Sequence, residues 1–450
     1  TRLFPGSVES YRASGVQPTP DQRAGLGLPP PLGVWEGPGS PDDPENAAPL
    51  VAYHLAASNA DAVRDLLANT VILLDPCLNP DGFARFAQWA NSHRGKHPVA
   101  AAVSREHNEV WPGGRTNHYF FDINRDWLPT ELRESRGRMA WWHTWRPQIS
   151  TDHHEMGPEA TFFFQPGIPS RNNPNTPAAT VELTGAIATY HAAELDRIGS
   201  LYYSEESFDD FYYGKGSTYP DINGAVGILF EQASSRALLR DTDENGRLTY
   251  AFTVRNQLAT SVSTLRAAVA LRDRMLRHMR GFYADGLNGA YVIALDRHRT
   301  RGQELAQTLT RSRVRVHAPV EAVRVDGRTV QPGDALVVPL DQPQGRLVRA
   351  AMERTLTYTD SLFYDVSAWT FPLAYGAEGA EMARSPRLGA EVDVVMDGGR
   401  LVGGRADVAY AIRWDRYFAP RALARIQATG ARVRLAQSPF EAPSGGAVQR

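Results

Sequence analysis

The chain has almost no cysteine, no excess of charge of either sign and no long apolar run. Cys77 is the single cysteine in 450 residues, which excludes an intramolecular disulfide and a zinc cluster held by thiolates. The formal net charge is -2 with 22% charged residues, so the basic surface of a nucleic-acid-binding protein is missing and we predict no nucleic-acid partner. No apolar run approaches the roughly 18 residues of a membrane helix, so we predict no membrane span.

The first part of the chain also lacks hydrophobic periodicity. Residues 1–49 are rich in Pro, Gly and Ser, a composition that buries little apolar surface and is typical of disorder. The chain starts at Thr1 without a basic-then-apolar signal segment, and we interpret this start as a cut. From Leu50 onward, apolar residues recur at helical spacing and are followed by the short apolar run Thr70–Asp75, as in a buried parallel strand. Helix followed by strand predicts a layered α/β domain.

Polar clusters follow several predicted strands. They are a tight turn at Asn79-Pro80-Asp81-Gly82, the cluster Asp122-Ile123-Asn124-Arg125 after an aromatic strand, Asp152-His153-His154-Glu155 after a strand that starts near Arg146, and Glu231 at the end of a strand from Ala225. The carboxyl ends of strands are where α/β sheets place their chemistry. We therefore expect a functional site built from these clusters.

Each cluster has a functional and a structural interpretation. Adjacent imidazoles flanked by carboxylates suit a metal ion, but His153 and His154 also fit a polar loop or a half-buried pair. Arg125 offers a planar fork for a carboxylate, or it pairs with a neighbouring Asp. Glu231 is costly to bury unless it is used or paired, so it is either a general base or a member of a salt bridge.

Further elements are predicted from periodicity and from glycine and proline positions. They are helices over Leu132–Trp145, Val181–Ile198 (ending at Gly199) and Leu258–Met279 (ending at Gly281), and a strand over Thr161–Phe164. A second domain follows, with strands Ala290–Leu295 and Ala335–Leu340 and a helix over Gly302–Leu309 between them. These βα alternations still run at the chain's end, so we expect the second domain to be incomplete.

The order and spacing of the four clusters resemble the zinc carboxypeptidase family, whose best-known member is carboxypeptidase A. The resemblance covers about Leu50 to Tyr283. It implies a mixed eight-stranded sheet with helices on both faces and a zinc ion at the carboxyl ends of the strands. It further implies a hydrolase that releases C-terminal residues from a peptide or protein substrate.

The resemblance also implies roles for individual residues. His154 corresponds to the third zinc ligand, and His153 to an ordinary intervening residue. Asn124 and Arg125 correspond to the pair that binds the terminal carboxylate of the substrate. Glu231 corresponds to the base that takes a proton from zinc-bound water.

Two further roles have several candidates. Arg94, 15 residues after Asn79, is placed where the family keeps the Arg that stabilises the oxyanion, with Arg105 and Arg115 as rivals. Tyr213 is the candidate for the substrate-capping tyrosine. Tyr212 and Tyr219 also fit that role.

The chain departs from the family at the first two zinc ligands. The expected His-x-x-Glu positions fall near Pro38 and Pro41, which cannot bind zinc. The nearby Glu36, Glu45 and His54 do not form the spacing. Since a catalytic zinc site needs three protein ligands, we expect this chain to bind zinc poorly.

Three interpretations stay open. Residues 1–49 are an altered or misread segment joined to an intact enzyme body, or the protein is a zinc-free pseudoenzyme that binds peptide C-termini through Asn124 and Arg125. The third is an amidase of the same fold that acts on cell-wall peptides or acylated amino acids.

We divide the chain into residues 1–49, 50–285 and 286–450. The last region resembles the glutamine-amidotransferase-like domains that follow the catalytic domain in some large bacterial zinc carboxypeptidases. It has no cysteine nucleophile, so we expect a structural or substrate-positioning role. A disulfide-free chain is compatible with cytoplasm or periplasm, and the resemblance to exported bacterial enzymes implies a secreted or periplasmic protein.

Overall fold

The computed structural model describes residues 47–354, 370–396, 401, 404–406, 408–438, 440–442 and 446–448. The Pro-rich segment lies outside these residues except for its last three positions, which begin a helix. The expected ligand positions near Pro38 and Pro41, and the alternatives Glu36 and Glu45, lie outside them as well.

The described chain divides into two compact units. The first contains residues 47–287 and 343–354, and the second contains residues 288–342 and the described residues from 370 onward. Each unit has its own sheet. No helix among the described residues is long and apolar enough to cross a lipid bilayer.

The first unit is built on a three-stranded sheet in the order β1-β3-β2. Strand β1 (Ile149–Met156) runs parallel to β3 (Val226–Ala233), and β2 (Phe162–Phe164) pairs antiparallel to β3. A separate hairpin joins β4 (Leu239–Thr242) and β5 (Gly246–Thr249). The sheet is mixed, as predicted, but the eight strands implied by the family resemblance are not present among the described residues.

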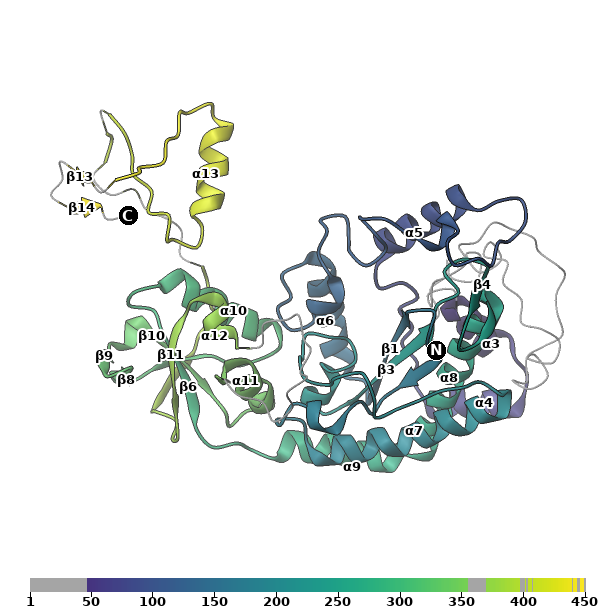
Figure 1. Ribbon diagram of the computed structural model, residues 1–450. Helices are drawn as coiled ribbons and strands as arrows, with labels where there is room; N and C mark the ends of the chain where they lie inside the picture. Colours follow the sequence, from purple (N-terminus) through teal and green to yellow (C-terminus); the bar gives the residue numbers. More distant parts are fainter. Residues whose placement is uncertain are drawn as a thin grey trace. The chain divides into compact units, whose positions relative to one another are not determined.

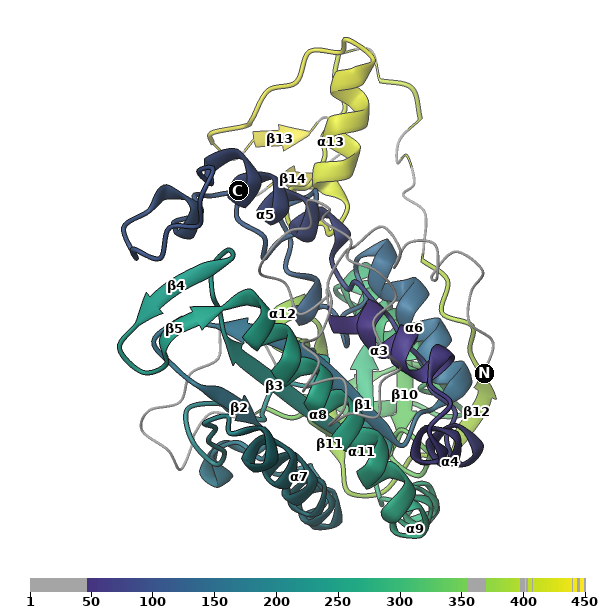
Figure 2. The same ribbon diagram turned by 90° about the vertical axis from the view of Figure 1, so that its right-hand side faces the viewer.

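Long helices lie against this sheet (Figures 1 and 2). Helix α7 (Ala178–Ile198) and helix α8 (Tyr250–Ala270) contact each other and β3. The core that they share with the strands contains the following buried side chains: Phe162, Phe164, Leu183, Ile187, Leu195, Val226, Ile228 and Phe230. Burying each such side chain stabilises the fold by about 1.5–3 kcal/mol, so this core holds β2 and β3 against helix α7.

A second apolar cluster attaches the first described helices to α8. Helix α3 (Ala47–Ala57) contributes Leu50, Val51 and Leu55, and α4 (Asp61–Asn69) contributes Val63. Their buried partners on α8 are Val254, Leu258 and Val262. The helical periodicity that begins at Leu50 is therefore confirmed, although it belongs to two helices and not to one.

Helices α5 (Pro80–His93), α6 (Arg133–Trp145), α9 (Arg272–Ala284) and α11 (Gly345–Met352) complete the first unit, with short 3-10 turns at η2 (Arg105–His107), η3 (Ile123–Arg125), η4 (Pro169–Arg171) and η5 (Pro220–Asn223). The predictions of the helix at α6, the strands at β2 and β3, and the helix at α7 are confirmed. Gly199 ends α7 with φ +68°, in the left-handed region that favours glycine.

Three predictions in the first unit are wrong. Thr70–Asp75 is an unpaired segment in which Val71 is 75% exposed, not a buried strand. The turn predicted at Asn79 is the start of α5, where the Asn79 side chain accepts a hydrogen bond from the Gly82 amide. The aromatic strand predicted before Asp122 is an exposed loop. An apolar run forms a strand only where a partner strand is available, and the run itself does not reveal this.

The predicted helix Leu258–Met279 is also wrong in its extent. It is two helices, α8 and α9, separated at Leu271, whose ψ of 9° leaves the helical range. Neither glycine nor proline marks this position. The break therefore has no local signal in the sequence.

The second unit contains a five-stranded sheet in the order β11-β6-β10-β7-β12. The strands are β6 (Ala290–Ala294), β7 (His317–Pro319), β10 (Ala335–Pro339), β11 (Glu378–Met382) and β12 (Leu388–Glu391), and every pair between them is antiparallel. The predicted strands β6 and β10 are confirmed. The parallel sheet that βα alternation normally produces is not formed, so the topology gives no support to a glutamine-amidotransferase-like domain.

The other elements of the second unit are the hairpin of β8 (Val323–Val325) and β9 (Arg328–Val330), the hairpin of β13 (Phe440–Ala442) and β14 (Gly446–Val448), helices α10 (Arg299–Arg311), α12 (Phe371–Tyr375) and α13 (Ala419–Ala428), and the turn η6 (Pro332–Asp334). Helix α10 contains the helix predicted over Gly302–Leu309. In Figure 1 it lies beside the strands β6 and β10.

Candidate active site

The pairing of β1 with β3 brings His154 and Glu231 together. In the parallel register His154 lies opposite Glu231, and Asp152 lies opposite Leu229. The polar cluster is therefore part of β1. The sequence had suggested instead that it follows the strand and begins a loop. The register places a histidine and a carboxylate on adjacent strands at one end of the sheet.

Asp152 and Asn124 fix the ring of His154. The Nε2 atom of His154 lies 2.8 Å from Oδ1 of Asp152, and Nδ2 of Asn124 donates to Oδ2 of Asp152 at 2.9 Å. Nδ2 of Asn124 also lies 2.8 Å from Nε2 of His154, and Oδ1 of Asn124 accepts from the Gly216 amide at 2.9 Å. Nδ2 of Asn124 thus holds this pair, while its Oδ1 is bonded to the Gly216 backbone.

The charges of the site are shifted by burial and by one another. Burial acts to raise the pKa of Asp152, but the His154 imidazole and the hydrogen bonds from His154 and Asn124 lower it to about 2. Burial acts to lower the pKa of His154, and the adjacent Asp152 carboxylate outweighs it and raises that pKa. Burial raises the pKa of Glu231 to about 6, against the lowering effect of His154, Arg115 and Arg125. Glu231 is therefore poised to exchange a proton close to neutral pH.

His154 has the geometry of one zinc ligand. Asp152 occupies Nε2 and leaves Nδ1 without a hydrogen bond among the described residues, and a carboxylate that orients the second ring nitrogen is the usual companion of a metal-binding imidazole. In the part of the chain that the structure describes, however, no other two ligand atoms complete a set of three with His154. The described residues thus fit one zinc ligand and not a whole site, so no chemical step is derived through zinc.

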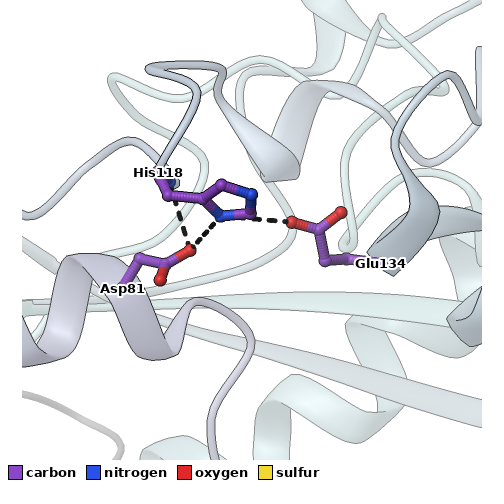
Figure 3. Close-up of side chains that lie close together, drawn as sticks. All are labelled: Asp81, His118 and Glu134. Atoms are coloured by element: carbon purple, nitrogen blue, oxygen red, sulfur yellow. Dashed lines mark hydrogen bonds and ion pairs between the residues drawn. The ribbon is translucent and has the colours of Figure 1, made fainter.

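One other set of side chains has metal-ligand spacing. Asp81, His118 and Glu134 each offer a ligand atom, and these atoms lie within 4.8 Å of one another (Figure 3). His54, the nearby alternative noted in the sequence, is fully buried in α3 with neither ring nitrogen hydrogen-bonded, and burial lowers its pKa to about 4. Neither feature belongs to the His154 pair.

Arg125 lies in η3 beside Asn124 and has no carboxylate partner among the described residues. Its neighbours are occupied: Asp122 binds Nε of Arg115 at 2.9 Å, and Asp126 accepts from the amides of residues 131 and 132. Arg125 donates from Nη1 to the Asn124 carbonyl at 3.0 Å, and its buried Nε has no partner. The alternative that Arg125 pairs with Asp122 or Asp126 is therefore wrong.

A cavity of about 840 Å³ opens next to this cluster in the first unit. Its lining includes Arg115, Asn124, Asp152, His153 and His154. Arg125 and Glu231 are not among its lining residues, although each adjoins one that is: Arg125 follows Asn124 in the chain, and Glu231 pairs with His154 across the strands.

The three candidate arginines differ in their relation to the site. Arg94 follows the end of α5 and does not line the cavity. The Arg105 guanidinium lies over the Trp89 ring, 5.1 Å from its centroid. Arg115 lines the cavity, and its charge lowers the pKa of Asp152 and of Glu231. The structure therefore brings Arg115 to the site and leaves Arg94 outside it.

The three candidate tyrosines are buried and hydrogen-bonded. Tyr213 is 3% exposed, and its hydroxyl lies 2.7 Å from that of Thr176; burial raises its pKa well above the ordinary value. Tyr219 lies 2.7 Å from Nε2 of His143. Tyr212 donates to the Arg125 carbonyl at 3.0 Å, so it touches a residue of the site.

His153 and two residues not singled out in the sequence complete the surroundings. Nδ1 of His153 lies 2.8 Å from Oε1 of Gln257. The same Gln257 side chain donates from Nε2 to the His154 carbonyl at 2.9 Å. A Cβ atom on Gly216 would lie 2.8 Å from Oδ2 of Asp152, so only glycine fits there. The Gly-Lys-Gly run at 214–216 could have indicated a tight turn at Gly216. Gln257 lies in a helix, and no pattern in the sequence distinguishes it.

The comparisons with known proteins agree with this geometry. Residues 44–214 match the model of the family described as zinc carboxypeptidase, so the family predicted from the sequence is supported for this part of the chain. The match includes His154, Asn124 and Arg125 and ends before Glu231. No curated protein sequence matches the chain.

Two solved structures are similar in part. A metallo-carboxypeptidase from Burkholderia cenocepacia has 16% sequence identity and a TM-score of 0.37, with 52% of this chain and 55% of that chain covered. A metallo-carboxypeptidase from Pseudomonas aeruginosa in complex with (2-guanidinoethylmercapto)succinic acid has 14% identity and a TM-score of 0.35, with 52% and 53% covered. The chain thus spans about half the length of each. TM-scores this low do not establish a shared fold.

Proposed function

We propose that the first unit is a hydrolase of the metallocarboxypeptidase type that releases C-terminal residues from peptides. The observation that carries this proposal is the register that sets Glu231 opposite His154, with the carboxylate-free Arg125 beside Asn124. The family match over residues 44–214 supports it.

Arg125 and Arg115 supply the positive charge for the substrate. Arg125 keeps its buried Nε without a partner, and a guanidinium grips a carboxylate through two parallel hydrogen bonds. Arg115 uses Nε for Asp122, while its Nη atoms have no partner among the described residues. We assign terminal-carboxylate binding to Arg125 and oxyanion stabilisation to Arg115 in place of Arg94. Asn124 holds the Asp152–His154 pair.

Glu231 is the proton carrier in this proposal. Its pKa of about 6 suits a group that accepts a proton at neutral pH and returns it to the leaving amine. Among the described residues His154 would contribute one ligand atom, Nδ1, to a zinc ion, and a completed zinc site would supply Lewis-acid activation of water and of the scissile carbonyl. Tyr213 as the capping residue stays a prediction, since its ring is buried.

The test is hydrolysis of an N-acylated dipeptide by the purified chain with equimolar zinc. We expect Glu231→Gln to lower turnover by about 10²- to 10⁴-fold, the usual contribution of a general base, while peptide binding is retained. The matched control is Glu182→Gln at an exposed site on α7, which should leave turnover unchanged. Unchanged turnover in Glu231→Gln would remove Glu231 from this role.

A second function, peptide binding without cleavage, is favoured by one observation. Among the described residues His154 has no two companion ligands for zinc, whereas Arg125 has no carboxylate partner and keeps its Nε unbonded. Metal analysis separates the two: near-equimolar zinc supports the hydrolase, and tight peptide binding without zinc or turnover supports the pseudoenzyme. The amidase interpretation is tested by cell-wall peptides and acylated amino acids as substrates in the same assay.

Two further proposals concern the whole protein. Export to the periplasm or medium follows from the family resemblance alone and is checked by cell fractionation. A substrate-positioning role for the second unit is checked by comparing long and short peptide substrates. The domain division at residues 49 and 285 likewise stays a prediction.

A further inference from the structure

The loop that carries Arg115 is held by the first turns of α5. Nδ2 of Asn79 contacts the carbonyls of Gly114 at 3.3 Å and Arg115 at 3.2 Å. Arg85 donates to the carbonyls of residues 113, 116 and 117 at 2.6, 3.0 and 3.2 Å. The backbone is thus bonded on both sides of Arg115 and at Arg115 itself.

A carboxylate of the same helix holds the far end of this loop. Oδ2 of Asp81 accepts from the His118 amide at 3.1 Å and lies 2.7 Å from Nδ1 of His118. Glu134, from α6, lies 4.0 Å from the same ring nitrogen and accepts from Nδ2 of Asn117 at 3.2 Å. Figure 3 shows the His118 ring between the two carboxylates, so the loop is tied to α5 and to α6.

The helix and the loop approach each other as closely as backbones can. A Cβ atom on Gly82 would lie 1.9 Å from the Gly114 carbonyl oxygen, so glycine is required at this point of α5. Side chains from Asn79, Asp81 and Arg85 therefore reach the loop without strain. We call these three residues the α5 clamp.

We propose that the α5 clamp consists of positioning residues that aim the Arg115 guanidinium into the cavity. Arg115 is half-exposed, and a free arginine side chain populates many rotamers. Fixing its backbone and bonding its Nε to Asp122 leaves the Nη atoms pre-aligned for an anion. This inference rests on the proposed function only for the nature of that anion, the peptide substrate.

The test uses the full chain and the variant Asp81→Ala in a double-mutant cycle with Arg115→Met. The probe is an N-benzoyl dipeptide with a free carboxylate, and its dissociation constant is measured by calorimetry. We expect Asp81→Ala to weaken binding about tenfold when Arg115 is present and less than twofold in the Arg115→Met background, because the loss acts through Arg115. Asp81→Asn, which keeps an acceptor oxygen, should restore most of the affinity.

A second readout follows Arg115 directly. The Nε–H resonance of Arg115, assigned by its loss in Arg115→Lys, should move or broaden in Asp81→Ala and in Arg85→Lys, which keeps the charge but loses the planar fork. The control Asp61→Ala removes an exposed carboxylate from the first turn of α4 and should change neither readout.

The outcomes separate the clamp from the proposed function. Equal losses of affinity in both backgrounds, or an unchanged Arg115 resonance in both clamp variants, would overturn the clamp. If the unsubstituted protein does not bind the peptide at all, the proposed function fails. The Nε–H resonance of Arg115 then remains as the test of whether the α5 clamp positions Arg115. If Asp81→Ala does not fold, Arg85→Lys enters the cycle in its place.

Discussion

The structure brings together residues that short motifs single out, and it separates from them the one that was placed by counting along the chain. Asn124 lies 2.8 Å from His154, and Arg125 is its neighbour in the same motif. Arg94 was placed by counting from Asn79, and it lies outside the cavity, whereas Arg115 lines it. Counting fails here because the chain between Asn79 and Asn124 folds back on α5, and the hydrogen bonds that direct this path join residues far apart in sequence.

Arg125, which has no carboxylate partner among the described residues, leads to a prediction about ligand choice. Arg125→Lys keeps the charge but loses the two-point fork, so the affinity for peptides with a free C-terminal carboxylate should fall about 10- to 100-fold. Affinity for the corresponding peptide amides should not change. The exposed Arg133→Lys is the control for a general effect of the exchange. Equal losses for acid and amide would contradict carboxylate recognition by Arg125.

A carboxyl pair away from the site makes stability depend on pH. Asp210 and Asp221 share a hydrogen bond; burial raises the pKa of Asp210 to about 7 and that of Asp221 well above its ordinary value. Both pKa values are higher in the folded state than the unfolded value of about 4, so their contribution to stability is full below pH 4 and is lost as pH rises through 7.

We therefore expect the melting temperature to fall between pH 5 and pH 8, and the fall to be smaller in Asp221→Asn. The asparagine keeps an oxygen for the Gly227 amide, which bonds Oδ1 of Asp221 at 2.7 Å, and removes the like charge. The exposed Asp243→Asn should retain the slope of the unsubstituted protein. Calorimetry at several pH values measures both. A slope in Asp221→Asn as steep as that of the unsubstituted protein would argue against the pair.

At the scale of elements, long helices and buried strands were predictable and their pairing was not. Helices α6 and α7 carry their periodicity and ends in their own sequences. The segment Thr70–Asp75 has the composition of a strand but pairs with no strand among the described residues. Whether a strand forms, and in which register, depends on contacts between distant parts of the chain. The pairing of His154 with Glu231 is such a contact.

The turn at residues 214–217 allows a stability prediction with an internal control. Gly216→Ala would place its Cβ 2.8 Å from Asp152 and 2.9 Å from the Trp127 ring, and this overpacking should destabilise the fold by about 1–3 kcal/mol. Gly185→Ala, inside α7 with nothing within 4 Å of the new Cβ, should stabilise it by about 0.5–1 kcal/mol. Denaturant unfolding measures both. Similar effects of the two substitutions would contradict the close approach at Gly216.

At the scale of the whole molecule, the architecture of the two units could be predicted only in part. The family resemblance implied eight strands in the first sheet, and three are present in the described chain. The sequence of the second unit predicted alternating strands and helices, but β7, β8, β9 and β10 follow one another without an α-helix, and the sheet is antiparallel. Alternation along the chain limits the possible folds but does not determine strand direction, because connections of similar length serve both arrangements.

The central claim is that the first unit acts on the free C-terminus of a peptide. The most direct measurement is mass spectrometry of an N-acylated tripeptide and of its C-terminal amide, each incubated with the full chain and equimolar zinc. The account predicts stepwise release of the C-terminal residue from the free acid and none from the amide. Equal cleavage of both peptides, or internal cleavage of either, would contradict it.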